Sequence, residues 1–359
     1  MEQQERRFVG IDLGKRTYEL KIINPNGKAT GFKGKTSIQG RQELYSKLQK
    51  TDRIAIEVCS LAMIMAKEMI ERIGCEVLVL NAGLLPIIYK STKKTDKEDA
   101  LKLARLMKTH DNDELPVVTL PTEEELRRRK LLTEYRQLKQ SRTKEINRLH
   151  AVFVSAGITE IKRKDLATAK SRENCIPLLS GIDRLQAERI IEMLNLEEKQ
   201  IKILDDIVNK ECKGDEAVKK LETVPGVGRL TALAFVSYIG NGERFSNASQ
   251  VANCIGLVPR IDISCSIKRY GGITKRGCKH LRQLLVLASW ALVKSREGGA
   301  LKEKFDYMVQ VQGKNKNKAI IATARKLAEL LYTLLKTDKT YEVRISNSIQ
   351  SLVQQALSA

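Results

Sequence analysis

The fold is decided near the N-terminus, where residues 7–12 read Arg-Phe-Val-Gly-Ile-Asp. An apolar run of this length that ends in an acid predicts a short buried strand with Asp12 at its end. Further strands are predicted at 18–23, 28–33, 53–58 and 76–80, and helices at 37–50 and 61–73, with Gly74 as a helix stop. This β-β-β-α-β-α-β order predicts an α/β domain whose mixed sheet is flanked by helices.

Long polar helices dominate the middle of the chain. Pro121-Thr122-x-x-Glu125 is a capping box, and it predicts the start of a helix that runs to about Phe153. A second long helix is predicted at 183–212, and the pair favours a helical spacer, which could be a coiled coil or a dimerisation arm. We therefore divide the chain into an α/β domain (1–112), a helical spacer (113–218), an all-α C-terminal domain (219–345) and a polar tail (346–359).

The charge balance indicates the class of partner. The 359 residues include 64 Lys and Arg against 43 Asp and Glu, a formal charge of +21. Such an excess favours a nucleic-acid partner, although a ribosomal protein would show it too. Aromatic residues make up only 4% of the chain, too few for base stacking to be the main binding device. We expect phosphate contacts from Lys and Arg to dominate the affinity, including those of Arg127, Arg128 and Arg129.

The cysteines and histidines exclude other classes of site. Seven cysteines are scattered without a C-x-x-C pair, and the three histidines have no metal-ligand spacing. This pattern fits a reducing cytosol better than a disulfide framework and offers no zinc site, so we expect any metal to be a hard cation on carboxylates. The N-terminal segment has no apolar signal core, and no stretch is as long as a membrane span, so we expect no membrane partner and a cytoplasmic, nucleoid-associated location.

Four acids carry the predicted chemistry. Asp12 and Glu57 end two buried strands, while Asp96 and Asp99 lie three residues apart at the start of a helix and so share one face. On a ribonuclease-H-like strand pattern these carboxylates could converge, and such a cluster needs a counter-charge. Two Mg²⁺ ions would supply it, with Mn²⁺ as an alternative. Each acid taken alone could equally be a turn or helix-capping residue.

A glycine turn in the C-terminal domain has a second predicted role. Val224-Pro-Gly-Val-Gly228 followed by a helix at 230–239 predicts a helix-hairpin-helix, in which Gly226 and Gly228 let backbone N–H groups approach a DNA phosphate. A plain turn between two helices is the alternative.

Three segments together resemble a known family. GIDLGKRTYEL, IEVCSLAMIMAKEMIERIGCEVLVLNAG and KKTDKEDALKLARL are similar to the RuvC-like domain of the DEDD transposases of prokaryotic insertion sequences. The resemblance implies that Asp12, Glu57, Asp96 and Asp99 are the catalytic and metal-binding acids. It also implies DNA partners, namely the element ends and the target, and a guide (bridge) RNA.

The C-terminal third resembles the transposase domain of the same family. The resemblance places a catalytic serine five residues after the proline of Gly-Leu-Val-Pro, at Ser264, and a basic segment at 271–277. Ile263, Cys265 and Ser266 stand where the family usually has glycines, so Ser266 stays open as an alternative, and a Cys265 thiolate is disfavoured beside a phosphate. Four basic residues could neutralise the scissile phosphate: Lys268, Arg269, Lys275 and Arg276.

These features predict an enzyme, a transposase that cuts and rejoins DNA through a phosphoserine. Its site would be composite, because a partner subunit could supply the acids. We expect the enzyme to act as a dimer or tetramer. One rival is a Holliday-junction-resolvase-like endonuclease that uses the same acids with water as the nucleophile. The other is a non-catalytic nucleic-acid-binding protein whose acids are relics.

Overall fold

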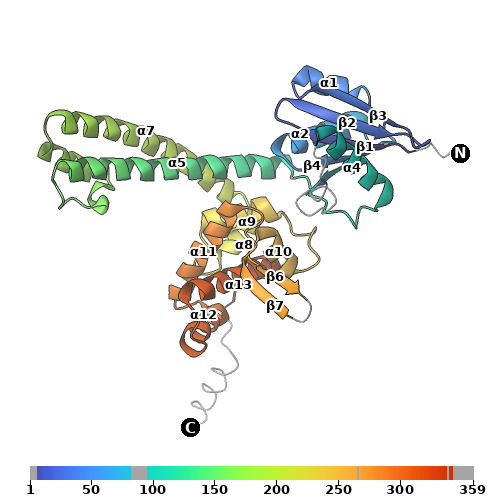
Figure 1. Ribbon diagram of the computed structural model, residues 1–359. Helices are drawn as coiled ribbons and strands as arrows, with labels where there is room; N and C mark the ends of the chain where they lie inside the picture. Colours follow the sequence, from blue (N-terminus) through green and yellow to red (C-terminus); the bar gives the residue numbers. More distant parts are fainter. Residues whose placement is uncertain (1–5, 82–94, 265–266, 338, 343–359) are drawn as a thin grey trace, which may run out of the picture. The chain divides into compact units, whose positions relative to one another are not determined.

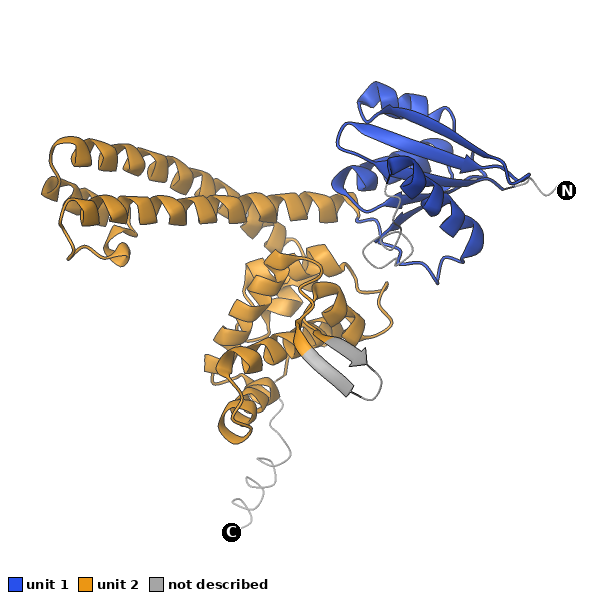
Figure 2. Cartoon of the chain, viewed as in Figure 1, with its two compact units in different colours: residues 1–121 blue, residues 122–359 orange. Residues whose placement is uncertain are grey.

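The computed structural model describes residues 6–81, 95–264, 267–337 and 339–342, without the side chains of 261–270. The chain forms two compact units, residues 1–121 and 122–359, which are coloured separately in Figure 2. In the described ranges, no helix is long and apolar enough to cross a membrane.

The first unit contains a five-stranded mixed sheet in the order β3-β2-β1-β4-β5 (Figure 1). The β1–β2 and β2–β3 pairs are antiparallel, and the β1–β4 and β4–β5 pairs are parallel. The strands are β1 Phe8–Leu13, β2 Thr17–Ile23, β3 Ala29–Lys35, β4 Arg53–Glu57 and β5 Glu76–Leu80, and the helices are α1 Ile38–Tyr45, α2 Ser60–Ile73 and α4 Asp96–Thr109. The predicted mixed sheet with flanking helices is confirmed.

The two faces of this sheet pack against different helices because side chains alternate along each strand. Val9 and Ile11 of β1 face a core that includes Met65 and Met69 of α2. On the other face, Ala55 of β4 packs with apolar residues of α4. The predicted helix stop is also confirmed, because Gly74 adopts a left-handed conformation with φ 75°.

The second unit is mostly helical. Its helices are α5 Glu123–Ser155, α6 Ala169–Cys175, α7 Gly181–Lys213, α8 Glu216–Glu222, α9 Arg229–Ile239, α10 Ala248–Ile255, α11 Lys279–Lys294, α12 Gly299–Asp306 and α13 Lys316–Lys336. The predicted capping box opens α5, since the Glu125 N–H donates to Thr122 Oγ1 at 3.1 Å and the Thr122 N–H donates to Glu125 Oε2 at 3.0 Å. Short helical turns lie at Arg163–Leu166, Ile176–Leu178 and Tyr307–Val311.

One helix, α5, joins two separate cores of this unit. Near its start, Leu132 belongs to the core formed by α8 to α13. Near its end, Leu149 and Phe153 pack with Leu194 of α7 and with the turns that connect the two helices. Of the residues expected to form a separate spacer, 122–218 therefore share a compact unit with the C-terminal helices, and 113–121 belong to the first unit. Figure 1 shows α5 and α7 side by side.

The expectation of an all-helical C-terminal domain is wrong at one place. Strands β6 Pro259–Ser264 and β7 Ile267–Ile273 form an antiparallel hairpin. The signal was present in the sequence, because Ile261 and Ile263 alternate with polar residues at the period of a strand. The polar tail, 346–359, lies outside the described residues.

Candidate active site

Gly10 determines how closely α4 lies against the sheet. A Cβ atom at this position would overlap the backbone carbonyl of Ala100 and the backbone nitrogen of Ala104, both in α4. The helix therefore lies directly on β1, and only glycine allows this approach. Asp12 lies two residues further along the same strand and so faces the same side of the sheet as Gly10.

The register of the sheet brings the second acid beside the first. Gly10 pairs with Ala55 and Ile11 with Ile56 in the parallel β1–β4 ladder, so the next positions on the two strands are Asp12 and Glu57. Asp96 and Asp99 lie in the first turn of α4, one turn before the residues that contact Gly10. Sheet register and helix packing thus gather all four predicted acids in one region of the first unit.

The pKa of Asp12 indicates that the four acids lie close together. Burial, followed by the negative charges of Asp96, Asp99 and Glu57 in that order of effect, raises its pKa to about 6. The pKa of an isolated aspartate is about 3.9. Each of the three other acids is therefore close enough to repel the Asp12 carboxylate, and the cluster as a whole favours a cation.

The donor chemistry of this cluster fits a hard divalent cation, because it consists of carboxylate oxygens alone. Within the described ranges, however, no three acidic, histidine or cysteine side chains are arranged as a ready-made metal site. Asp99 instead forms an ion pair with Lys102, at 2.7 Å between Oδ1 and Nζ. The acids are gathered by the fold, and their side chains would have to rotate to share one cation.

Two charged neighbours of this cluster and the close approach at Gly10 were missed from the sequence. Lys102 is mostly buried and holds Asp99. Glu19 pairs with Asp12 across β1 and β2, is only 5% exposed, and lies 3.5 Å from Lys33. Strand alternation placed Glu19 on this face in principle, whereas the close approach at Gly10 depends on a contact between distant segments.

Gly10→Ala should destabilise the protein by about 1–3 kcal/mol, because the added methyl group overlaps the backbone of α4. Displacing α4 also moves Asp96 and Asp99, so strand cleavage should fall as well. Urea unfolding measures the stability change. Gly272→Ala is the control, since a Cβ there meets open space and should change stability by less than about 0.5 kcal/mol. Equal stability of the two variants would contradict this account of the helix position.

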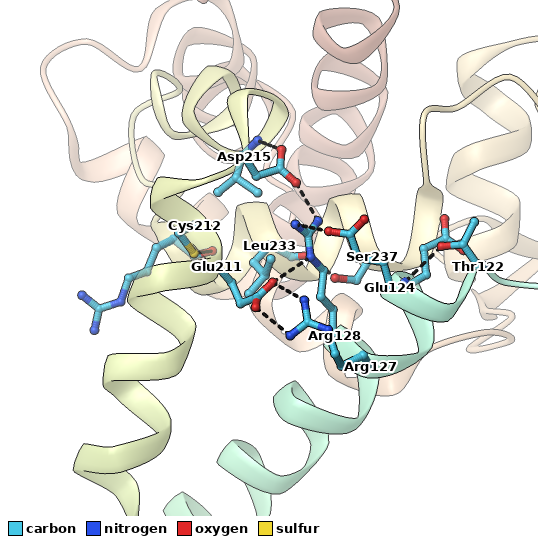
Figure 3. A network of polar contacts seen from close by, with 12 residues as sticks. Thr122, Glu124, Arg127, Arg128, Glu211, Cys212, Asp215, Leu233 and Ser237 are labelled. Carbon is cyan, nitrogen blue, oxygen red and sulfur yellow. Dashed lines mark hydrogen bonds and ion pairs between the residues drawn. The ribbon is translucent and has the colours of Figure 1, made fainter.

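Arg127, Arg128 and Arg129, predicted to bind phosphate, have partners within the chain, and Figure 3 shows those of Arg127 and Arg128. Arg127 forms a two-bond ion pair with Glu211, with distances of 2.6 and 2.7 Å. Arg128, which is 8% exposed, forms ion pairs with Glu124, Glu211 and Asp215 at 2.8, 3.2 and 2.6 Å. Arg129 donates from Nε to the Ser237 carbonyl at 2.7 Å. These arginines join α5 to α7, α8 and α9, and their binding to phosphate remains a prediction.

Arg128→Ala should destabilise the protein by about 3 kcal/mol, since it leaves the mostly buried Glu211 and Asp215 without this counter-charge. Arg127→Ala is the matched control on the same helix with the same partner. The Arg127 side chain is 55% exposed, so its loss should cost less than about 1 kcal/mol. Equal losses in urea unfolding at pH 7 would show that burial does not govern the network.

The same network predicts a pH dependence. The guanidinium of Arg127, followed by that of Arg128, holds the pKa of Glu211 below its usual range. A carboxylate whose pKa is lower in the folded protein than in the unfolded chain stabilises the fold fully at pH values above its pKa in the unfolded chain. This contribution is lost as the pH falls through the pKa of the folded protein. The stability difference between the wild type and Arg128→Ala should therefore be largest near pH 7 and shrink below about pH 4.3, the ordinary glutamate pKa.

Other basic side chains of α5 are better placed for a phosphate. Lys130 and Lys144 are exposed, as is Lys139, whose Nζ lies 5.3 Å from the ring centre of Tyr135. Arg148 is exposed too, but it forms an ion pair with Glu145 at 2.8 Å. The sequence could not show that Arg127 and Arg128 are paired within the chain, because Glu211 and Asp215, which pair with them, lie more than 80 positions away.

The two glycines of the predicted hairpin differ in their surroundings. Helices α8 and α9 flank the turn, as expected. Gly226 has φ 83°, and a Cβ there would lie 2.5 Å from the Ala288 carbonyl oxygen, so this glycine packs against α11. Gly228 is the N-cap of α9, and a Cβ there would meet nothing within 4 Å. Of the two, Gly228 has the open surroundings that a phosphate would need.

The predicted nucleophile lies in the β-hairpin of the second unit. Ser264 is the last residue of β6, and Lys268 and Arg269 lie in β7. Ser266 and Cys265 are outside the described residues. Exposed Lys275 and Arg276 follow β7, and Lys275 has φ 56°, a left-handed conformation that is unusual for a side chain of this kind. Arg282 holds this turn by donating to the carbonyl oxygens of Arg276 and Gly277, at 2.6 and 3.1 Å.

Comparison with known proteins gives the context for these sites. Residues 9–158 match a family model of DEDD transposases of the IS110 group, described as "Transposase", and residues 218–305 match one described as "Transposase IS116/IS110/IS902 family". The two matched segments contain the acids and the serine hairpin respectively.

Curated relatives extend the similarity over nearly the whole chain. The transposase for insertion sequence element IS1328 of Yersinia enterocolitica is 26% identical, over 91% of this chain and 96% of its own. The transposase for insertion sequence element IS1111A of Coxiella burnetii is 27% identical, over 93% and 91%. The pilin gene-inverting protein of Moraxella lacunata is 32% identical over 35% of this chain and 38% of its own. The protein thus belongs to the IS110/IS116 family of insertion-sequence transposases.

Proposed function

We propose that this transposase cuts and rejoins DNA with two groups of residues, the acids around Asp12 and the hydroxyl of Ser264. The observation that carries the proposal is the convergence of Asp96, Asp99 and Glu57 on Asp12, whose pKa they raise. Four carboxylates that are gathered by sheet register and by the close approach at Gly10 repel one another. A bound cation would relieve this repulsion, so a cation-dependent reaction explains why the four acids lie together.

The acids have the role of holding Mg²⁺ at the DNA backbone. When bound there, Mg²⁺ polarises the phosphate and stabilises the charge on the attacking and leaving oxygens, and two such ions would suit four acids. Asp12 and Glu57 extend from rigid strands, and Asp96 and Asp99 from a helix that Gly10 holds on the sheet. Rotation of the Asp99 side chain toward the cluster would release Lys102, whose ammonium group could then face the DNA.

Ser264 has the role of the nucleophile. Its Oγ forms a bond to the phosphorus while one phosphorus–oxygen ester bond of the DNA breaks, the serine proton passes to solvent, and the released DNA oxygen takes up a proton. The phosphoserine keeps the ester bond for rejoining, because a DNA hydroxyl can attack it and restore the serine. Lys275 and Arg276 are exposed close after β7, which suits them to neutralise the phosphate, and we assign the same role to Lys268 and Arg269.

The partners in this proposal are the DNA of the element ends and of the target, together with a bridge RNA that selects them. The formal charge of +21 and the exposed lysines of α5 support a polyanionic partner. The RNA is tested by adding the transcribed non-coding flank of the element to the purified protein. Sequence-directed cleavage that requires this RNA supports guidance, and equal cleavage without it contradicts guidance.

One experiment separates this function from that of a resolvase-like endonuclease. The protein is incubated with labelled DNA, the transcribed flank and Mg²⁺, and the products are separated on a denaturing gel. A slowly migrating protein–DNA band supports the phosphoserine. Free cut ends without such a band would mean that water is the nucleophile and that only the acids are catalytic.

A further inference from the structure

The two ends of the segment that carries Ser264 lie against each other. This segment leaves α10, forms the β6–β7 hairpin and continues into α11 (Figure 1). Beyond the last paired residues of the hairpin, the Thr274 N–H donates to the Val258 carbonyl oxygen at 2.9 Å. The Lys275 N–H donates to the Gly256 carbonyl oxygen at 3.2 Å. These two bonds extend the pairing of β6 and β7 toward the helices, so they close the base of the hairpin.

Two glycines allow the backbones at this base to touch. A Cβ atom at Gly256 would overlap the backbone of Arg276. A Cβ atom at Gly277 would overlap the backbone carbonyl of Cys254. Both glycines also have a left-handed backbone, with φ values of 78° and 75°. Because Cys278 directly follows Gly277, the contact with the Cys254 carbonyl brings one cysteine from each end of the segment to the same place.

The two thiols are accessible, and each lies within the electrostatic reach of the other. Cys254 is exposed and Cys278 is partly exposed. Desolvation raises the pKa of the Cys254 thiol, Arg244 and Arg129 lower it, and the charge of Cys278 raises it. Such an effect weakens with distance, so it supports neighbouring sulfur atoms. The Cys278 side chain is also held in place, because the Leu281 N–H donates to its Sγ at 3.4 Å.

We propose that Cys254 and Cys278 are an oxidation site, at which a peroxide converts the two thiols into a disulfide bond. One sulfur attacks an oxygen of hydrogen peroxide, the O–O bond breaks, and a sulfenic acid and one water form. The second sulfur then displaces the hydroxyl group of the sulfenic acid, so that the S–S bond forms and a second water leaves. The two sulfurs lose two electrons to the peroxide, and the two thiol protons end in the two waters.

The bond would close residues 254–278 into a covalent loop. A disulfide restricts the open and unfolded conformations of the chain between its two cysteines. The loop contains Ser264 together with Lys275 and Arg276, so the opening of this segment would depend on the oxidation of the two thiols. The inference goes beyond the proposed function, because the bond can form whether or not Ser264 is the nucleophile.

Peptide mapping of the full chain tests the bond. The protein is treated with hydrogen peroxide, the remaining thiols are blocked with iodoacetamide, and the chain is digested with trypsin without a reductant. Mass spectrometry should find peptide 245–260, which contains Cys254, joined to peptide 277–279, which contains Cys278, and a reductant should separate them. Cys265 lies in a third peptide, 261–268. A bond from either cysteine to Cys265, or no bond within the chain, would overturn the proposal.

Hydrogen exchange tests the restraint on the segment. After oxidation, the Lys275 amide at the base of the hairpin should exchange at least 10-fold more slowly than in the reduced protein, because the bond opposes opening of the base. In Cys254→Ser and in Cys278→Ser the oxidant should not change this rate. Linked peptides without slower exchange, or slower exchange in either serine variant, would contradict the restraint.

The matched control is Cys59→Ser. Cys59 is also exposed and also caps a helix, because the Ala62 N–H donates to its Sγ at 3.3 Å at the start of α2, but it lies in the first unit. This variant should keep both the linked peptides and the slowed exchange, and loss of either would overturn the assignment of the bond to Cys254 and Cys278. All of these measurements are made without DNA or Mg²⁺, so their failure would leave the cleavage chemistry untouched.

Discussion

Asp12→Asn should lower Mg²⁺-dependent strand cleavage by on the order of 10³-fold or more, while nucleic-acid binding stays close to that of the wild type. The asparagine keeps the shape of the side chain and removes the charge at the point where the other three acids act. Glu57→Gln, Asp96→Asn and Asp99→Asn should have losses of the same order. A gel assay of labelled DNA measures cleavage, and fluorescence anisotropy measures binding.

The matched control is Glu98→Gln, in the same first turn of α4 as Asp96 and Asp99. Glu98 does not contribute to the raised pKa of Asp12, so its neutralisation should leave cleavage within about twofold of the wild type. Near-normal cleavage by two or more of the four acid variants would exclude the assignment of the cluster as the catalytic site.

Loss of folding can be separated from loss of chemistry in the same variant. Because burial and the neighbouring acids raise the pKa of Asp12, its charged form destabilises the metal-free fold at neutral pH. Asp12→Asn removes that repulsion, so its urea midpoint in the presence of a chelator should equal or exceed that of the wild type. A variant that is inactive yet at least as stable has lost chemistry rather than structure.

The sheet and its acids were accessible from the sequence because local patterns determine them. The strand 76–80 was predicted with its observed bounds, and Asp12 and Glu57 were recognised at the ends of apolar runs. The i, i+3 spacing of Asp96 and Asp99 specified a shared helix face. What the sequence could not supply was the distance between these groups, which depends on Gly10 and the register of β1 with β4.

In the long helices α5 and α7, by contrast, the sequence could not predict which side chains are buried or paired. The sequence predicted a long helix at 183–212 but not which of its apolar residues are buried: Leu194 and Val208 are buried, while Leu185 is exposed. The helix has two apolar faces about 120° apart, and residues of both faces are interspersed along the sequence. Only the structure shows which of the two faces is buried. In the same way, the acids that pair with Arg128 on α7 and beyond lie more than 80 residues away, so its role in packing was not visible from charge alone.

Ser264→Ala should abolish the covalent protein–DNA species, whereas Ser266→Ala should leave it unchanged. Ser264 is the last residue of β6 and pairs with Ile267, whereas Ser266 lies outside the described residues. Each variant removes one serine hydroxyl, and the two serines are two positions apart in the sequence. They are therefore matched controls for each other, and only the position of the hydroxyl differs between them.

The acids and the serine should be mutually dependent in this assay. A serine hydroxyl is a weak nucleophile at neutral pH, so it needs a phosphate whose charge is already neutralised. Asp12→Asn should consequently remove the adduct even though Ser264 is intact, and Ser264→Ala should remove it even though the acids are intact. A denaturing gel shows the adduct as a slowly migrating band that disappears after protease treatment. If the band persisted in Ser264→Ala and vanished in Ser266→Ala, the nucleophile would be Ser266, and if Asp12→Asn kept the band, the acids would not act in the step that forms it.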